Sequence, residues 1–136
     1  MPIRSRMTAC LAAFCAMGLC ALPLAACDPS VQDIRIAAQE FRFQPAEVRL
    51  HGPATFRLIV VNEGNEPHEF SSTLFSDPNV RLVNEAAGPP PFTGRGVIKL
   101  LPRQAVPLLL QAQAGAYFYR CMIPGHHGMQ GTLIVE

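Results

Sequence analysis

Short segments of alternating hydrophobic and polar residues recur from residue 33 to the end of the chain. They are rich in β-branched and aromatic side chains, and clusters of Gly, Pro, Asn or Asp separate them. No segment repeats its apolar residues at the 3.6-residue period of a helix. Short strands at this spacing are typical of an antiparallel sandwich or small barrel. The pattern therefore predicts an all-β domain with strands in 33–38, 41–50, 55–62, 68–72, 96–101, 106–113, 116–121 and 131–136.

Two prolines and one long connection interrupt this pattern. Pro45 and Pro107 cannot donate to a sheet ladder, so we expect them at an edge, a strand start or a bulge. Residues 73–96 form a connection with a proline cluster at 89–91, and its stretch 79–87 could form a short helix or an extra strand. Connections of this length are usually functional or mobile, but the pattern assigns no task to this one.

The N-terminal segment predicts export. Two arginines precede an apolar stretch at 7–24, which is the layout of a secretory signal. An uncleaved membrane helix is the alternative, because the stretch is nearly long enough to span a bilayer. Residues 24–27 read Leu-Ala-Ala-Cys and resemble the bacterial lipoprotein signal. This resemblance implies cleavage before Cys27 and lipidation of its thiol.

The same resemblance divides the chain into a cleaved lipoprotein signal peptide at 1–26 and a single domain at 27–136, which is the size of one ordinary domain. The lipid would anchor the domain to a membrane without any spanning helix. We therefore expect the protein in the periplasm, lipid-anchored to a bacterial membrane. Asp28 resembles a retention signal of enteric bacteria and slightly favours the inner membrane.

The distribution of charge gives no sign of a nucleic-acid partner, and we expect none. From Asp28 onward the chain carries nine Lys and Arg residues and ten Asp and Glu residues, without a block of either sign. The sequence also contains no Ser-His-Asp constellation and no glycine-rich phosphate loop that would argue for hydrolysis or nucleotide chemistry.

One cysteine is left after the predicted signal is removed. The chain has five cysteines; three lie inside the signal and Cys27 would be acylated, which leaves Cys121 unpaired. In an oxidising compartment a free thiol is either protected or used. A buried, inert cysteine is the alternative.

The side chains that could hold a metal are sulfur and imidazole groups. They are Cys121, Met122, Met129, His51, His68, His126 and His127. A thiolate combined with imidazoles and a thioether suits copper. Zinc accepts Cys and His but gains little from Met, and its structural sites use more Cys. His51 falls in a turn between strands, where we expect a solvated surface residue.

Nearly the whole predicted domain resembles a cupredoxin, a small blue copper protein. Residues 41–50 resemble the opening strands of that family, and the Asn-turn followed by Pro-His-Glu-Phe at 67–70 resembles the segment that bears its first histidine ligand. Residues 100–121 resemble the strand pair that leads to the cysteine. The pattern Cys-x4-His-x2-Met-x-Gly at 121–131 resembles the ligand loop.

The resemblance implies a Greek-key β-sandwich or barrel of the cupredoxin type that holds one copper per chain, cycling between Cu(I) and Cu(II). His68, Cys121 and His126 would form a trigonal set of ligands, with Met129 as a long axial ligand. Met122 directly follows the cysteine, so we expect it to point away from the metal. Glu69 stands where better-known members often have an Asn that bridges the two ligand loops; Asn62 or Asn65 could replace that bridge.

Two histidines compete for one position in the loop. Successive side chains of an extended segment point to opposite sides, so His126 and His127 should not both face one metal. The family's Cys-x-x-Pro-Gly-His turn favours His126, and the gap from His126 to Met129 is long enough to wrap an ion. His127 would then lie near the surface.

Other copper roles need residues that this chain lacks. A binuclear centre needs two cysteines in the loop, and multicopper oxidases and nitrite reductases need more histidines and further domains. We therefore expect a monomeric one-electron carrier that is not an enzyme and that exchanges electrons with redox partner proteins. The alternative is a periplasmic copper chaperone, buffer or metal-uptake accessory protein, because the same ligands could serve either function.

Overall fold

The computed structural model describes residues 31–83, 92–93 and 96–136. The predicted signal peptide at 1–26, its Cys27 and the prolines at 89–91 lie outside the described residues. Within the described ranges no helix is long and apolar enough to cross a bilayer.

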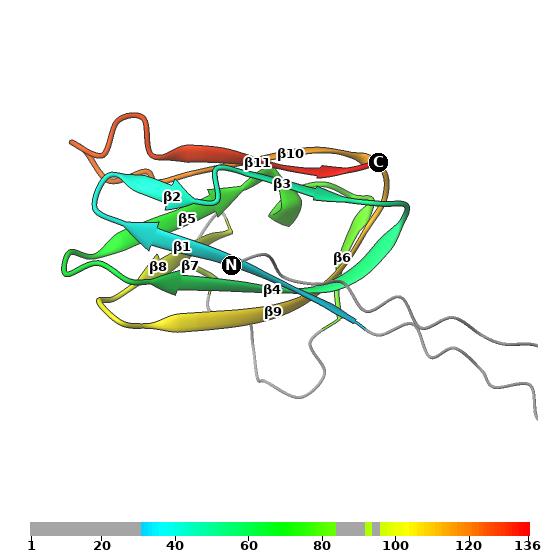
Figure 1. Ribbon diagram of the computed structural model, residues 1–136, viewed down its shortest axis with the longest axis horizontal. Coiled ribbons are helices and arrows are strands. Elements are labelled where there is room, and N and C mark those ends of the chain that lie inside the picture. Colours follow the sequence, from blue (N-terminus) through cyan, green and yellow to red (C-terminus); the bar gives the residue numbers. More distant parts are fainter. Residues whose placement is uncertain (1–30, 84–91, 94–95) are drawn as a thin grey trace, which may run out of the picture.

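The described strands form two sheets that face each other (Figure 1). One sheet has the strand order β2-β1-β4-β9-β6. Its strands are β1 (Gln32–Gln39), β2 (Arg42–Gln44), β4 (Ala54–Asn62), β6 (Val80–Leu82) and β9 (Ala105–Ala112). The other sheet has the order β3-β11-β10-β5-β8-β7. Its strands are β3 (Glu47–Leu50), β5 (His68–Ser72), β7 (Phe92–Thr93), β8 (Val97–Leu100), β10 (Gly115–Arg120) and β11 (Gln130–Val135). The predicted all-β sandwich is confirmed.

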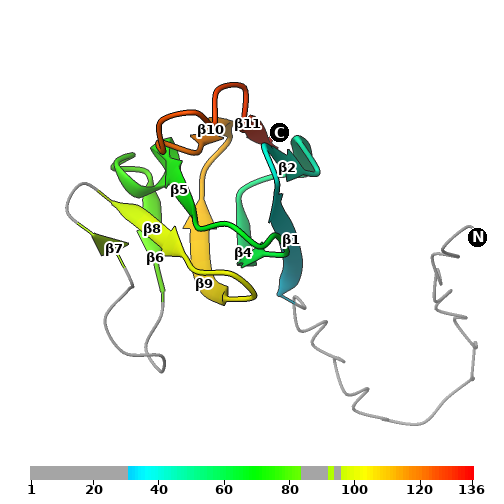
Figure 2. The same cartoon turned by 90° about the vertical axis from the view of Figure 1, so that its left-hand side faces the viewer.

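Two strand pairs depart from the predicted antiparallel arrangement. β1 pairs with β4 and β3 pairs with β11, and both pairs are parallel. β1 and β2 form a hairpin in one sheet (Figure 2), and the chain then crosses to the other sheet, where β3 runs alongside β11 (Figure 1). Hydrophobic alternation fixes which face of a strand is buried, but it does not fix the direction of the neighbouring strand.

The two prolines lie where the sheet ladder does not need a donor. Pro45 separates β2 from β3. Pro107 lies within β9, opposite Ile59 of β4. Among the described residues, the pairing on its other side is with β6 at Leu110–Ala112 and does not reach Pro107. The described strands therefore leave Pro107 on an open edge of β9, which suits its missing N–H.

The described residues of the connection at 73–96 contain three short elements. Its first residues form a 3₁₀ helix, η1 (Thr73–Phe75), in which the Ser72 side chain accepts a hydrogen bond from the Leu74 N–H. β6 and β7 follow. The extra strand is therefore the alternative that forms in the stretch 79–87, at Val80–Leu82.

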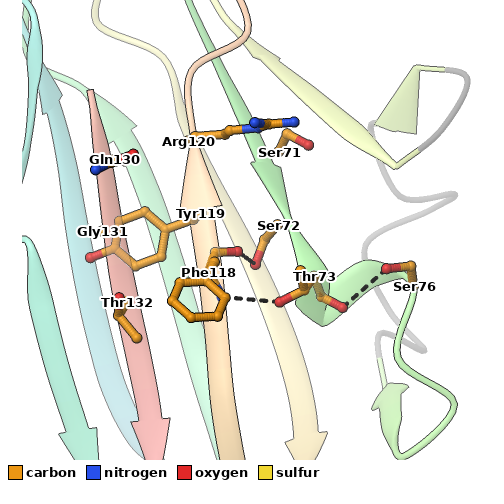
Figure 3. Close-up of a pocket in the computed structure, with 10 residues that line it drawn as sticks. All are labelled: Ser71, Ser72, Thr73, Ser76, Phe118, Tyr119, Arg120, Gln130, Gly131 and Thr132. Atoms are coloured by element: carbon orange, nitrogen blue, oxygen red, sulfur yellow. Dashed lines mark hydrogen bonds between the residues drawn. The ribbon is translucent and has the colours of Figure 1, made fainter. Parts of the chain in front are cut away.

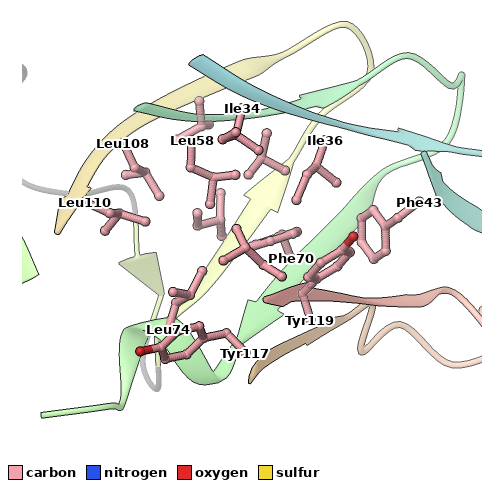
Figure 4. Close-up of a cluster of buried hydrophobic side chains, with 14 of the residues drawn as sticks. Ile34, Ile36, Phe43, Leu58, Phe70, Leu74, Leu108, Leu110, Tyr117 and Tyr119 are labelled. Atoms are coloured by element: carbon pink, nitrogen blue, oxygen red, sulfur yellow. The ribbon is translucent and has the colours of Figure 1, made fainter. Parts of the chain in front are cut away.

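The core lies between the sheets and is filled by the alternate residues of each strand (Figure 4). Ile36, Leu58 and Leu108 from one sheet are fully buried, as is Phe70 from the other. Burial of such side chains is the main favourable term in folding. The core holds both sheets in fixed positions, and with them the loops that join their strands.

An aromatic cluster of Phe43, Phe70 and Tyr119 fills one part of this core. The Tyr119 ring stacks on Phe70 with centroids 5.2 Å apart and meets Phe43 edge to face at 5.4 Å. Its hydroxyl donates to the Pro45 carbonyl at 2.8 Å, and burial raises the pKa of Tyr119 to about 12. Gly131 on the paired strand β11 lies against this ring, and a Cβ there would overlap the ring atoms.

Candidate metal centre

Four connections meet at one end of the sandwich, on the left of Figure 1. They are the β1–β2 turn, the β4–β5 turn at 63–67, the β8–β9 turn at 101–104 and the β10–β11 loop at 121–129. The candidate ligands come from this end: one begins β5 and the others belong to the 121–129 loop.

The first residue of β5 is His68, whose side chain is 1% exposed. The turn that leads to it is held by Asn62, which is fully buried at the end of β4. The Asn62 amide donates to the carbonyls of Glu66 and Leu100 at 2.8 and 3.0 Å, and its oxygen accepts from the Gly64 N–H at 2.9 Å. These bonds fix the turn before His68 to β8.

The 121–129 loop consists of two consecutive turns. In the first, the His126 N–H donates to the Ile123 carbonyl at 3.1 Å, and Gly125 has φ +90°. In the second, the Met129 N–H donates to the His126 carbonyl at 3.2 Å, and Gly128 has φ +87°. A positive φ at the third position is the mark of a type II turn.

The loop is closed at its base, where the Cys121 N–H donates to the Met129 carbonyl at 2.9 Å. This bond continues the antiparallel pairing of β10 and β11 by one step. Cys121 is therefore held as firmly as a strand residue, while His126 lies at the junction of the two turns.

His68, Cys121 and His126 come together at this end, with one potential ligand atom of each within 4.8 Å of the others. The Nδ1 atoms of the two histidines are 3.2 Å apart, and the Cys121 Sγ lies 3.5 Å from the His126 Nδ1. Cys121 and His68 are buried and His126 is half-buried. Three soft or borderline donors from two separate parts of the chain thus converge on one point.

The electrostatic state of this group suits metal binding. Burial, with a smaller contribution from the nearby His126, lowers the pKa of His68 and keeps its imidazole neutral. A neutral imidazole is the form that binds a metal. The Glu69 N–H donates to the Cys121 Sγ at 3.4 Å and so joins the strand that begins at His68 to the cysteine. The His68 Nε2 has no hydrogen-bonding partner among the described residues, so packing and the strand hold this ring.

The structure places the other predicted residues as follows. Met129 is 1% exposed and belongs to the same buried cluster as Cys121. His127 is exposed, as is Met122 at 47%. His51 is also exposed, and its Nδ1 lies 3.2 Å from a Glu136 carboxylate oxygen. His126, and not His127, thus lies beside His68 and Cys121.

The bridge between the ligand loops is made by the backbone. Asn62 directs its hydrogen bonds to the turn before His68 and to β8, and the Asn65 side chain accepts from Arg103 at 3.2 Å. The contact from the His68 segment to Cys121 is the Glu69 N–H itself. A backbone donor is available whatever side chain follows His68, so the sequence could not indicate it.

Phe41 contacts the candidate ligand His126, and the sequence pattern did not predict this contact. Alternation along 41–50 places Phe41 on the same face as the buried Phe43, but Phe41 has φ +63° and is 58% exposed. Its ring meets the His126 ring edge to face, with centroids 5.3 Å apart. The turn between β1 and β2 therefore directs this aromatic ring toward the half-buried His126. The positive φ of Phe41 turns its side chain away from the core, and no sequence motif predicts this φ.

The donor set and its spacing fit a transition metal. Metal–nitrogen bonds of about 2.0 Å and metal–thiolate bonds of about 2.3 Å allow two ligand nitrogens on one ion to lie up to about 4 Å apart. The two Nδ1 atoms, 3.2 Å apart, satisfy this limit. The distance of 3.5 Å from the Cys121 Sγ to the His126 Nδ1 also lies below it, although the longer metal–sulfur bond would allow more. Two histidines and a thiolate, with a methionine on the same loop, are the set expected for copper; a structural zinc site would use four strong ligands.

Comparison with known proteins identifies the fold. No protein-family model matches the chain, and no curated protein sequence matches it. Among solved structures, auracyanin B is 22% identical, with a TM-score of 0.54 over 77% of this chain and 88% of that chain. A reduced auracyanin from the photosynthetic bacterium Roseiflexus castenholzii is 19% identical, with a TM-score of 0.54 over 77% of this chain and 97% of that chain.

Auracyanin A from the green thermophilic photosynthetic bacterium Chloroflexus aurantiacus, described as a "blue" copper protein, gives a similar match. It is 20% identical, with a TM-score of 0.52 over 76% of this chain and 98% of that chain. These matches span nearly the full length of each neighbour. The two-sheet architecture and these neighbours together establish that the chain has the cupredoxin fold.

Proposed function

We propose that this protein is a one-electron carrier built on a type 1 copper site, in which His68, Cys121, His126 and Met129 would hold the copper. The observation that carries the proposal is the convergence of the three donors to within 4.8 Å of one another at one end of a cupredoxin fold. Bound there, one copper per chain would supply a one-electron couple between Cu(I) and Cu(II).

The chain contributes a frame that does not have to move during electron exchange. The hydrogen bond from the Cys121 N–H to Met129 fixes the thiolate, the Asn62 bonds fix the turn before His68, and the two glycine turns fix His126. The Glu69 N–H on the Cys121 sulfur adjusts the electron density of the thiolate. A rigid site of this kind favours electron exchange over catalysis, which would need an open position for a substrate.

The proposal includes a location and partners. A lipid on Cys27 would hold the domain at the periplasmic face of a bacterial membrane, where redox partner proteins could exchange electrons with it. The end of the sandwich that carries His126 is the natural point of exchange, because His126 is the least buried of the three ligands.

Copper loading tests the proposal against copper handling as the alternative. We expect the purified protein with one equivalent of Cu(II) to develop an intense visible thiolate-to-copper band, to show a reversible reduction potential and to retain copper against weak chelators. A colourless Cu(II) form that gives up its metal readily would contradict electron transfer and support a chaperone or buffer.

The matched control for this experiment is Cys121→Ser, which removes the thiolate and keeps a side chain of similar size. We expect this variant to lose the visible band. An unchanged copper content and spectrum in Cys121→Ser would contradict the assignment of the thiolate.

A further inference from the structure

The outer face of the β5–β10–β11 sheet contains a hollow of about 680 Å³ (Figure 3). This volume lies in the range of small-molecule sites, about 300–1,000 Å³. The side chains that face it include Ser71, Phe118, Arg120, Gln130 and Thr132. None of these is one of the candidate copper ligands, so the hollow is a separate feature of the fold.

The strand register brings three polar side chains into one row across the hollow. Arg120 of β10 is paired with Ser71 of β5 on one side and with Gln130 of β11 on the other. Residues along a strand alternate between the two faces, so these three directly opposed residues lie on the same outer face. Figure 3 shows the Arg120 side chain extending from β10 towards Ser71, with Gln130 on the other side of β10.

An apolar floor lies beside this row. Phe118 is two residues before Arg120 on β10 and is 60% exposed, and it is paired with Thr132 of β11. Its backbone is fixed by side chains of the neighbouring segment: the Ser72 hydroxyl donates to the Phe118 carbonyl at 2.9 Å, and the Phe118 N–H donates to the Thr73 hydroxyl at 3.0 Å. The apolar floor of the hollow is therefore held in place before any ligand binds.

The polar groups of the row have no partners of their own. Within the described part of the chain, the side chains of Ser71, Arg120 and Gln130 make no hydrogen bond or ion pair. Other arginines of the sandwich are paired: Arg35 with Glu63, Arg49 with Glu47 and Glu136, and Arg57 with Asp33. Glu47, which is paired with Thr132 at the side of the hollow, is thus already neutralised by Arg49.

We propose that this hollow binds a small ligand with a carboxylate group and an apolar or aromatic body. The Arg120 guanidinium presents a planar fork that matches a carboxylate with two parallel hydrogen bonds. The Ser71 hydroxyl and the Gln130 amide can donate further hydrogen bonds from either side. The exposed Phe118 ring receives the body of the ligand. This proposal is independent of electron transfer.

One carboxylate of the chain itself competes for the guanidinium. Glu69 lies two residues before Ser71 on β5 and faces the same side of the sheet, where Lys99 of β8 is its paired neighbour. No ion pair joins Glu69 to Arg120 within the described residues. The guanidinium is therefore available to a ligand, but the negative charge of Glu69 on the same face opposes the approach of a second carboxylate.

Benzoate is a suitable probe because it has a carboxylate on an aromatic ring. We expect benzoate to cause saturable changes in the backbone amide NMR signals of Ser71, Phe118, Gln130 and Thr132, both in the copper-free and in the reduced copper-loaded full chain. Benzamide, a neutral molecule of the same shape, should bind at least about ten-fold more weakly, because hydrogen bonds between charged groups are the stronger class.

Four variants test the roles of the residues. Arg120→Gln should weaken benzoate binding about ten-fold or more, and Phe118→Thr should weaken benzoate but leave acetate unchanged. Glu69→Gln should strengthen binding by removing the competing carboxylate. Arg81→Gln, at an exposed arginine on the other sheet, is the control and should have no effect.

Three results would overturn the proposal: equal binding of benzoate and benzamide, an unchanged benzoate affinity in Arg120→Gln, or signal changes confined to the 121–129 loop. The last result would mean that the carboxylate acts at the candidate copper ligands and not in the hollow. The backbone NMR spectra of the variants also report whether each one is folded.

Discussion

At the scale of single residues, the structure assigns different roles to chemically identical neighbours. His126 ends one turn and begins the next, so its Nδ1 faces the sulfur of Cys121 at 3.5 Å. His127 is the second residue of the second turn and is exposed. Two adjacent histidines with the same donors therefore differ in whether they can reach a metal at all.

This difference gives the first prediction. His126→Ala should abolish the intense visible band of the copper-loaded protein, because it removes one of the three converging donors. His127→Ala should preserve both the band and the copper content. Absorption spectra and metal analysis of the two variants provide the measurement, and the reverse result would overturn the assignment of His126.

Gly131 is a second position at which one added atom should change the stability of the fold. A Cβ at this residue would overlap the ring of Tyr119, which is buried and cannot move without disturbing Phe43 and Phe70. We expect Gly131→Ala to lower the free energy of unfolding by about 1–3 kcal/mol, the usual cost of overpacking. Urea denaturation of the metal-free protein measures this change.

Gly115→Ala is the matched control, since Gly115 also lies in the β10–β11 pair. A Cβ there would approach the Tyr117 ring no closer than 3.4 Å, an ordinary contact. This variant should change stability much less than Gly131→Ala. Equal effects of the two substitutions would mean that loss of a strand glycine, and not the collision with Tyr119, determines the cost.

At the scale of elements, the 121–129 loop is shaped by its two turns. Each turn needs a residue with positive φ, and Gly125 and Gly128 supply it at +90° and +87°. The second turn brings the Met129 backbone back to Cys121 and so closes the loop. The geometry of the candidate copper site is therefore set by the backbone conformation of two glycines as well as by the ligand side chains.

Gly128→Ala should accordingly weaken copper retention. The positive φ costs an alanine about 1–2 kcal/mol, and the loop can avoid this cost by leaving the conformation that aligns His126 with Met129. Gly52→Ala is the control, because Gly52 has φ +69° but precedes β4 and lies far along the chain from the ligands. Both variants should lose stability, and only Gly128→Ala should lose copper faster to a chelator. Equal copper retention would contradict this role for the turn.

At the scale of the whole molecule, two sheets packed on one aromatic and aliphatic core hold all four connecting turns at one end. Tyr119 links these parts, because its ring lies between the sheets and its hydroxyl donates to Pro45 at the crossing from β2 to β3. Its ionisation would place a charge inside the core. Global stability should therefore depend on the protonation state of this one residue.

The expected pH dependence follows from the direction of the shift. Burial raises the pKa of Tyr119 from 10.0 to about 12 in the folded protein. The stability contributed by the neutral phenol is fully present below pH 10 and is lost as the pH rises through about 12, by roughly 2–3 kcal/mol.

Urea denaturation between pH 9 and about 12 should show this loss in the wild-type protein, and Tyr119→Phe should remove most of it. The pKa of Tyr117 is also raised by burial, so the phenylalanine variant should keep a smaller alkaline dependence. An unchanged pH profile in Tyr119→Phe would assign the alkaline loss to other groups.

The sequence by itself determined the all-β class, the positions of most strands and the residues that could hold a metal. These features are local: alternation reports which face of a strand is buried, and the order Cys-Met-Ile-Pro-Gly-His-His-Gly-Met at 121–129 reports which donors share a loop. The restriction of prolines to positions where the ladder does not need their missing N–H is equally local, as Pro107 illustrates.

Only the tertiary structure decided how these parts meet. The parallel pairing of β1 with β4 and of β3 with β11, the contact of Phe41 with His126, and the row of Ser71, Arg120 and Gln130 each join residues far apart in the chain. Such contacts depend on strand direction, on register and on the sign of the backbone angle φ. These are set by the packing of the complete core and not by any short segment. For the same reason the sequence could propose His68 as a partner of Cys121, but only the folded sheets bring the two together.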